Sequence, residues 1–343
     1  MRVAIVDDTL MAVESLRRVL IESGDYQVAW IAHNGQEAVE QCNKDTPDLI
    51  LMDLVMPVME GVEATRLIMA NTPCPILIVT SSVSKYAQQV FAAMGYGALD
   101  AVNTPILSGD GSARGKSDFL SKIATIKQLS STRDSIKSIN IKNKSPTYLQ
   151  TSHKSDKHLI VIGSSAGGPQ ALHCILSALP AAFPLPIVIV QHIDALFSDD
   201  LSKWLDKCCN LTVKIAENGD HPRPGMVLLG GTNDHLVLNK AGCMEYTADP
   251  IEEAYRPSVN IFFKSVLEHW QGNITALLLT GMGRDGAQGL LHFKERGFYT
   301  IAQDEKSCAV YGMPRAAAEL NAAVDILPLD KIATRLIALG SQV

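Results

Sequence analysis

One stretch of the chain, residues 163–168, reads Gly163-Ser164-Ser165-Ala166-Gly167-Gly168. It follows the apolar run 159–162 and precedes residues 169–176, which begin with a proline and have a helical composition. The pattern therefore predicts a strand, a tight turn of small residues and a helix. A turn of this kind places one side chain on a sharp bend and directs backbone N–H groups at the space in front of it.

Two kinds of site use such a turn. Ser165 is the third residue of Gly-x-Ser-x-Gly, the spacing of a serine nucleophile, whereas a glycine-rich turn can also hold the phosphate of a nucleotide. The dinucleotide fingerprint requires glycine where Ser165 stands, and a carboxylate at the end of the next strand. That strand ends in Gln191-His192. Both mismatches disfavour nucleotide binding.

Two further side chains at predicted strand ends fit hydrolysis. A serine hydroxyl needs a base to take its proton, and His192 follows the next apolar strand. Asp285 follows a later apolar run and can fix the imidazole tautomer, while the backbone around Met282 can supply oxyanion donors. A lone histidine at a strand end is more often structural, and Asp285 can instead cap the helix that follows it. We expect a Ser165–His192–Asp285 triad because all three residues lie at strand ends of one predicted sheet.

The chain divides into three parts by composition. Residues 1–125 alternate short apolar runs with helical patterns, which predicts a doubly wound, flavodoxin-like parallel sheet of five strands. Residues 126–156 are rich in Ser, Thr, Lys and Asn and predict a flexible linker, although a surface helix near 123–129 stays open. Residues 157–343 alternate again and predict a second doubly wound α/β domain. Its expected strands are 159–162, 187–190, 213–216, 226–229, 236–238, 276–279, 299–301 and 324–326.

Composition excludes several functional classes. A chain of 343 residues, 47% hydrophobic and 19% charged, is typical of a globular protein with two domains. No apolar stretch reaches the roughly 18 residues of a membrane-spanning helix, and the first apolar run is too short for a signal peptide. The seven cysteines lack Cys-x-x-Cys spacing, and the net charge of −6 argues against nucleic acid as the main partner. We expect a cytoplasmic protein that neither inserts into a membrane nor binds nucleic acid.

Acidic residues follow two strands of the first domain. Asp7 and Asp8 come after the first strand and Asp53 after the third, and three converging carboxylates suit Mg²⁺. We assign the metal site to Asp7, Asp8, Asp53 and Val55. Isolated acids at strand ends are usually solvated, but a carboxylate beside a metal can attack a phosphoryl group. We therefore expect phosphorylation, with Thr80 at the end of the fourth strand hydrogen-bonding the phosphate.

Together these motifs resemble a known family. The chain resembles a response-regulator receiver joined to the protein-glutamate methylesterase domain of bacterial chemosensory systems, the CheB family. The stretches that carry the resemblance are 6–8, 47–57, 163–168, 191–192, 256–259, 280–286, 302–305 and 311–315.

The resemblance implies a role for each of four residues: Ser165 as nucleophile, His192 as base, Asp285 as the group that orients it, and Asp53 as the phosphorylated residue. It implies hydrolysis of glutamate methyl esters on methyl-accepting chemoreceptors with release of methanol, and glutamine deamidation in some members. It further implies a chemosensory histidine kinase as phosphodonor, Mg²⁺ at the receiver, and no cofactor for the esterase.

Three positions depart from the family pattern. Thr104 stands where receivers usually carry a lysine that pairs with the phosphoryl group, and Ala101 stands where an aromatic residue often relays the switch. Ala166 replaces a threonine beside the predicted nucleophile. The first two weaken the expectation of ordinary activation by phosphorylation, whereas the third leaves the triad intact. The rival hypothesis is a catalytically idle domain that binds receptors or a kinase. A DNA-binding regulator is disfavoured because the second domain is α/β rather than small and helical.

Overall fold

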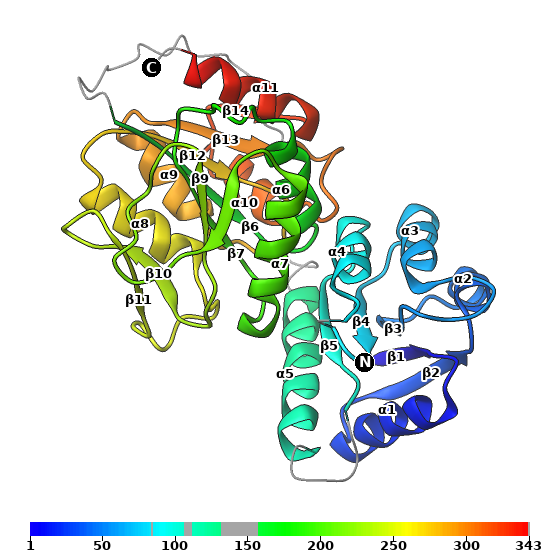
Figure 1. Cartoon of the computed structure of the whole chain (residues 1–343). Helices are drawn as coiled ribbons and strands as arrows, with labels where there is room; N and C mark the ends of the chain where they lie inside the picture. Colours follow the sequence, from blue (N-terminus) through cyan, green and yellow to red (C-terminus); the bar gives the residue numbers. More distant parts are fainter. Residues whose placement is uncertain (84, 106–111, 132–156, 342–343) are drawn as a thin grey trace.

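The computed structural model describes residues 1–83, 85–105, 112–131 and 157–341. These residues form two α/β units, each built on its own parallel sheet (Figure 1). The doubly wound architecture expected for both halves of the chain is confirmed.

The first unit is a sheet of five strands in the order β2-β1-β3-β4-β5. Its strands are β1 (Arg2–Val6), β2 (Gln27–Ala32), β3 (Leu49–Met52), β4 (Ile76–Thr80) and β5 (Asp100–Asn103). Its helices are α1 (Leu10–Ser23), α2 (Gly35–Lys44), α3 (Gly61–Asn71), α4 (Ala87–Gly95) and α5 (Ser112–Ser131). Alternate residues of each strand point to opposite faces, so Val3 and Ile5 pack under α1 and α5, whereas Ala4 and Val6 pack under α2, α3 and α4.

Helix α5 continues beyond the end expected for the first domain. We assigned residues 126–131 to a linker, but they belong to the helix. Ile126 is only 4% exposed and packs with Ile123 and Phe119 in the core beside α1, which explains why the helix continues. A helix near 123–129, which we left open, is therefore present, although Ile123 and Ile126 are buried in the core rather than lying on the surface. The rest of the expected linker, 132–156, lies outside the described residues. No helix in the described ranges has the length and apolar composition needed to cross a membrane.

The second unit contains a parallel sheet of seven strands in the order β14-β13-β12-β6-β7-β9-β8. Its strands are β6 (His158–Ser164), β7 (Ile187–Gln191), β8 (Thr212–Ile215), β9 (Met226–Leu229), β12 (Asn273–Leu278), β13 (Tyr299–Gln303) and β14 (Asp325–Leu327). Its helices are α6 (Gly168–Ser177), α7 (Ala195–Cys208), α8 (Val259–His269), α9 (Ala287–Glu295), α10 (Met313–Glu319) and α11 (Leu329–Gly340). Helices α6, α7 and α11 cover one face, and α8, α9 and α10 cover the other.

One expected strand lies outside this parallel sheet. The strand predicted at 236–238 is β10 (His235–Leu238), which pairs antiparallel with β11 (Met244–Thr247) in a separate hairpin. We did not predict β11. Only its first residue, Met244, is buried, so its sequence lacks the apolar run that marked the other strands.

Candidate active site

The turn around Ser165 has the predicted strand–turn–helix geometry. Strand β6 ends at Ser164 and α6 begins at Gly168, and between them Gly167 has a φ of +76°, in the left-handed region that favours glycine. The Ser165 N–H donates to the carbonyl of Thr280 (3.1 Å), and the Gly168 N–H donates back to the carbonyl of Ser165 (2.8 Å). These bonds hold Ser165 at the carboxyl end of the central strand.

Gln191 fixes the backbone of two predicted site residues at once. Its side-chain Nε2 donates to the carbonyl of Ser165 (2.8 Å) and to that of His192 (3.0 Å), while its Oε1 accepts from Ser164 Oγ (2.6 Å). The side chain is almost fully buried, and a Cβ atom at Gly168 would lie 2.0 Å from its Oε1. Because Gly168 has no side chain, it leaves the space that the Gln191 side chain occupies.

His192 and Asp285 form a hydrogen-bonded pair. They follow β7 and β12, the strands on either side of β6, and Nε2 of His192 lies 2.9 Å from Oδ2 of Asp285. Nδ1 of the imidazole is buried and has no hydrogen-bond partner among the described residues. Because Asp285 engages Nε2, Nδ1 is the ring atom left to take a proton. Ser165 Oγ makes no hydrogen bond to any described residue. The structure therefore brings His192 and Asp285 together beside Ser165, but Ser165 is not hydrogen-bonded to His192.

Asp285 lies at the N-terminus of helix α8. Besides His192, its donors are Ser258 Oγ (3.0 Å), Val259 N (2.6 Å), Asn260 N (2.9 Å) and Gly286 N (2.9 Å). Burial acts to raise the pKa of Asp285, but the hydrogen bond and charge of His192, together with the helix amides, outweigh it and hold the pKa below its ordinary value. Asp285 thus does cap a helix, as the alternative interpretation proposed. It accepts from the first amides of α8, however, whereas that alternative placed it at the start of the helix that follows it, α9.

The acidic residues of the first unit also converge. Asp7, Asp8 and Asp53 each place a carboxylate oxygen within 4.8 Å of the others, because β1 and β3 are neighbours in the sheet. Burial, and next the charge of Asp7, raises the pKa of Asp53 to about 6, and no basic side chain of the described residues contributes to that pKa. Val55 donates its backbone N–H to Asp53 (3.3 Å). A cluster of three carboxylates, whose ligand atoms are all oxygen, fits a hard divalent cation such as Mg²⁺.

Comparisons with known proteins identify the family. A model described as CheB methylesterase matches residues 160–336, and one described as response regulator receiver domain matches residues 3–114. The chain belongs to the CheB methylesterase family. A protein-glutamate methylesterase/protein-glutamine glutaminase 2 of Pseudomonas syringae pv. syringae is 50% identical over 342 residues, 100% of each chain. A protein-glutamate methylesterase/protein-glutamine glutaminase 3 of Pseudomonas aeruginosa is 50% identical over 98% of each chain. The solved CheB methylesterase catalytic domain of Thermotoga maritima is 38% identical and has a TM-score of 0.51, covering 54% of this chain and 100% of that domain.

In this CheB-family chain Ser165 and His192 line a cavity between the receiver and the second unit, whereas Asp285 is buried behind them. The cavity has a volume of about 540 Å³. Ser165, His192, Met282 and Tyr255 line it from the second unit, and Leu99, Asp100, Lys122 and Ile126 line it from the receiver. Within the described chain the Met282 N–H donates no hydrogen bond.

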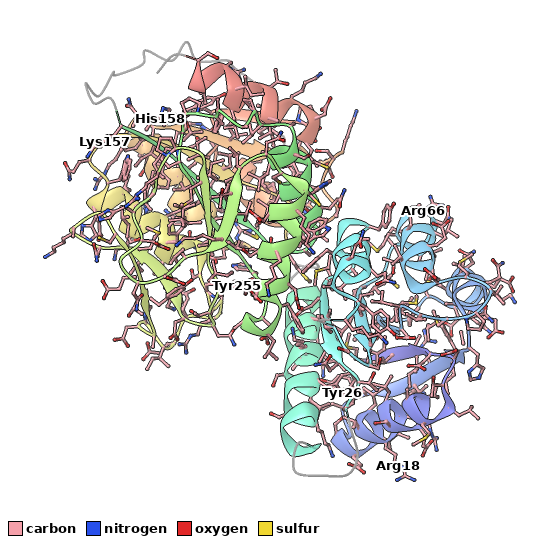
Figure 2. The ribbon with its side chains drawn as sticks, viewed as in Figure 1. Arg18, Tyr26, Arg66, Lys157, His158 and Tyr255 are labelled. Carbon is pink, nitrogen blue, oxygen red and sulfur yellow. The ribbon has the colours of Figure 1, made fainter. Side chains whose placement is uncertain are left out.

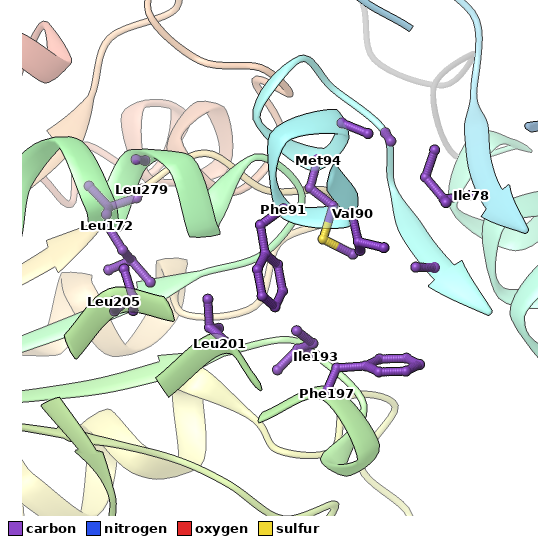
Figure 3. Close-up of a cluster of buried hydrophobic side chains, with 14 of the residues drawn as sticks. Ile78, Val90, Phe91, Met94, Leu172, Ile193, Phe197, Leu201, Leu205 and Leu279 are labelled. Atoms are coloured by element: carbon purple, nitrogen blue, oxygen red, sulfur yellow. The ribbon is translucent and has the colours of Figure 1, made fainter. Parts of the chain in front are cut away.

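Apolar packing holds the receiver over this cavity. The rings of Phe91 in α4 and Trp204 in α7 have centroids 5.4 Å apart. Figure 3 shows Phe91 pointing from α4 toward Leu201 of α7. Closer to Ser165, Leu99 packs against the buried cluster that contains Ala166 and Met282. The buried core is therefore continuous across the two units.

Some predicted site residues lie where we expected them, and other residues of the site we missed. Thr80 ends β4, beside β3, and is buried. Gln191 and Ser258 hold Ser165, His192 and Asp285 in place, yet we predicted no role for either of them. Ser258 had a detectable signal, a serine directly before an apolar helical stretch, which is the usual pattern of a helix N-cap.

Proposed function

We propose that this chain is a protein-glutamate methylesterase that hydrolyses glutamate methyl esters on methyl-accepting chemoreceptors. The observation that carries the proposal is the His192–Asp285 hydrogen bond of 2.9 Å beside the turn that presents Ser165. The names of the relatives that are 50% identical over the whole chain support the same substrate, and they extend the proposal to deamidation of protein glutamine.

In the proposed reaction Ser165 Oγ attacks the ester carbonyl and its proton passes to Nδ1 of His192. Asp285 accepts the Nε2–H bond and stabilises the imidazolium that forms. The Met282 N–H donates to the oxygen that becomes negative. Methanol leaves with the proton from His192, and water then hydrolyses the acyl-enzyme by the same steps to release glutamate and free Ser165.

The receiver is proposed to carry a phosphoryl group on Asp53, donated by a chemosensory histidine kinase. Asp7, Asp8, Asp53 and Val55 would hold Mg²⁺, which when bound neutralises charge on the phosphoryl oxygens. Thr80 would hydrogen-bond those oxygens. Thr104 replaces the usual lysine there, and its backbone N–H donates to the carbonyl of Thr80 (2.9 Å).

The proposed regulation follows from the cavity between the units. In the arrangement described here the receiver forms one wall of the cavity, so a receptor helix reaches Ser165 only after the receiver moves away. Phosphorylation of Asp53 would weaken the packing of Phe91, and a bias of a few kcal/mol is enough to shift such an equilibrium. The proposal keeps a receiver, a linker and a catalytic domain at 157–343, but it moves the end of the receiver from residue 125 to Ser131, where α5 ends, so that the proposed linker is 132–156. It places the chain in the cytoplasm.

The rival function is an inactive binding module for receptors or a kinase. Release of methanol from a methylated receptor separates the two, because an esterase loses this activity when Ser165 is replaced by alanine. A binding module shows no release above background with either protein.

A further inference from the structure

An aromatic ring lies directly against the predicted base. The ring of Tyr255 stacks on the imidazole of His192, with centroids 4.8 Å apart and an interplanar angle of 10°. Figure 2 shows Tyr255 on the side of the catalytic domain that faces the receiver. Tyr255 also lines the cavity that contains Ser165. Neither the family motifs nor the proposed reaction assigns it a role.

The segment that carries Tyr255 also carries two of the residues that hold Asp285. Arg256 pairs with Asp234 (2.9 Å). Two residues further on, Ser258 and Val259 donate their hydrogen bonds to Asp285. The segment 255–259 therefore contacts both members of the pair: Tyr255 stacks on the imidazole face of His192, and Ser258 and Val259 donate to the carboxylate oxygens of Asp285.

We propose that Tyr255 is a positioning residue for His192, which rests on the function proposed above. The parallel ring limits rotation of the imidazole out of the plane in which Nε2 meets Asp285, leaving Nδ1 toward the cavity. The π face of an aromatic ring also attracts a cation, so it favours the imidazolium that forms when Ser165 gives up its proton. An apolar wall for the substrate would not require a ring parallel to the base.

The chemical state of Tyr255 agrees with this role. Burial, followed by the negative charge of Asp285, raises the pKa of the Tyr255 hydroxyl above its ordinary value. The residue therefore stacks as a neutral phenol at neutral pH. The ring, rather than the hydroxyl, is the part that acts on His192.

Three variants of the full-length protein distinguish the effect of the aromatic ring from that of the hydroxyl and from that of apolar contact alone. Tyr255→Phe and Tyr255→Trp keep an aromatic face, whereas Tyr255→Leu keeps apolar cover and loses the π face. Methanol release from methylated receptor is measured with Mg²⁺ and a small-molecule phosphodonor. We expect kcat of the aromatic variants to stay within about threefold of wild type, and kcat of Tyr255→Leu to fall about tenfold with a smaller change in KM. The acid limb of the kcat/KM profile of Tyr255→Leu should move to lower pH, because the imidazolium loses a stabilising partner.

Two outcomes overturn the proposal. In one, Tyr255→Leu keeps the wild-type kcat and acid limb. In the other, Tyr255→Phe and Tyr255→Trp lose as much activity as Tyr255→Leu, which would assign the effect to the hydroxyl or to folding. Ser165→Ala, measured in parallel, separates this inference from the proposed function. If Ser165→Ala is inactive while Tyr255→Leu matches wild type, only the positioning role fails; if Ser165→Ala matches wild type, the esterase function itself fails.

Discussion

The ring of Phe91 in the receiver lies 5.4 Å from the ring of Trp204 in the catalytic domain, within one buried apolar cluster that spans both units. Helix α4, which carries Phe91, follows β4 and its terminal residue Thr80. The helix that contacts the catalytic domain is thus directly connected to the strand beside Asp53. This connection gives phosphorylation a short physical route to the interface.

Gly95 lies where α4 packs against α6 of the catalytic domain. A Cβ atom there would lie 2.6 Å from Cβ of Gln170 in α6, so Gly95→Leu should force the two helices apart. We expect methanol release without a phosphodonor to rise severalfold in this variant. Gly115→Leu in α5 is the matched control, because a Cβ at Gly115 meets no atom within 4 Å. Basal rates equal to wild type in both variants would contradict the proposed regulation.

The network around Gln191 predicts a second pair of variants. In Gly168→Ala the new methyl group would displace the Gln191 side chain, which bonds the backbone of both Ser165 and His192. We expect kcat to fall at least tenfold, with a lower melting temperature, because two buried carbonyls lose their donor at about 1–3 kcal/mol each. Gly230→Ala should behave like wild type, since its Cβ would have no neighbour closer than 3.6 Å. Similar kcat values for the two variants would show that Gln191 does not organise the site.

Ser258→Ala tests the support of Asp285. The depressed pKa of Asp285 contributes stability that is present above about pH 4 and lost as the pH falls through its folded value. Removing the Ser258 donor should lower kcat roughly threefold to tenfold and reduce the free energy of unfolding by about 1–3 kcal/mol at pH 7. Part of that loss should disappear as the pH falls from about 4 through the folded pKa of Asp285, whereas the part due to the lost N-cap of α8 should remain.

Ser265→Ala is the control for this measurement. Ser265 lies in the same helix and donates to Phe262, accepting from Leu238, without touching Asp285. We expect it to lower stability independently of pH and to leave kcat unchanged. A loss of kcat in Ser265→Ala as large as in Ser258→Ala would mean that helix stability alone explains both.

The sequence was sufficient to predict the sheets and the candidate residues at their edges, but not the contacts that hold them. Asp285 and His192 are 93 positions apart, and they meet because parallel strands end at one edge. Apolar runs identified the core strands, whereas β11 was not predicted because Met244 is the only buried residue of this strand. The roles of Gln191 and Tyr255 depend on side-chain directions that no local pattern encodes. The contact between Phe91 and Trp204 also could not be predicted from the sequence, because an apolar residue on α4 is equally compatible with the core of the receiver and with an interface.

Asp53 makes the stability of the receiver depend on pH and metal. Its folded pKa of about 6 lies above the ordinary value of 3.8, so this group lowers stability as the pH rises from about 4 to about 6. In EDTA at pH 7.5, Asp53→Asn should therefore unfold at a higher urea concentration than wild type. The free energy of unfolding should rise by at most about 3 kcal/mol, and by less because solvent screens the charge. Near pH 4 the difference should vanish. Mg²⁺ should stabilise wild type more than Asp53→Asn, and equal stabilisation would place the cation elsewhere.

Methanol release from a methylated chemoreceptor tests the central claim most directly. The full-length protein is assayed with Mg²⁺ and a phosphodonor beside Ser165→Ala, and both proteins are checked for equal melting temperature. The account predicts steady release by the wild-type protein and background release by Ser165→Ala. Equal rates for the two proteins, or no release by wild type above background, would contradict it.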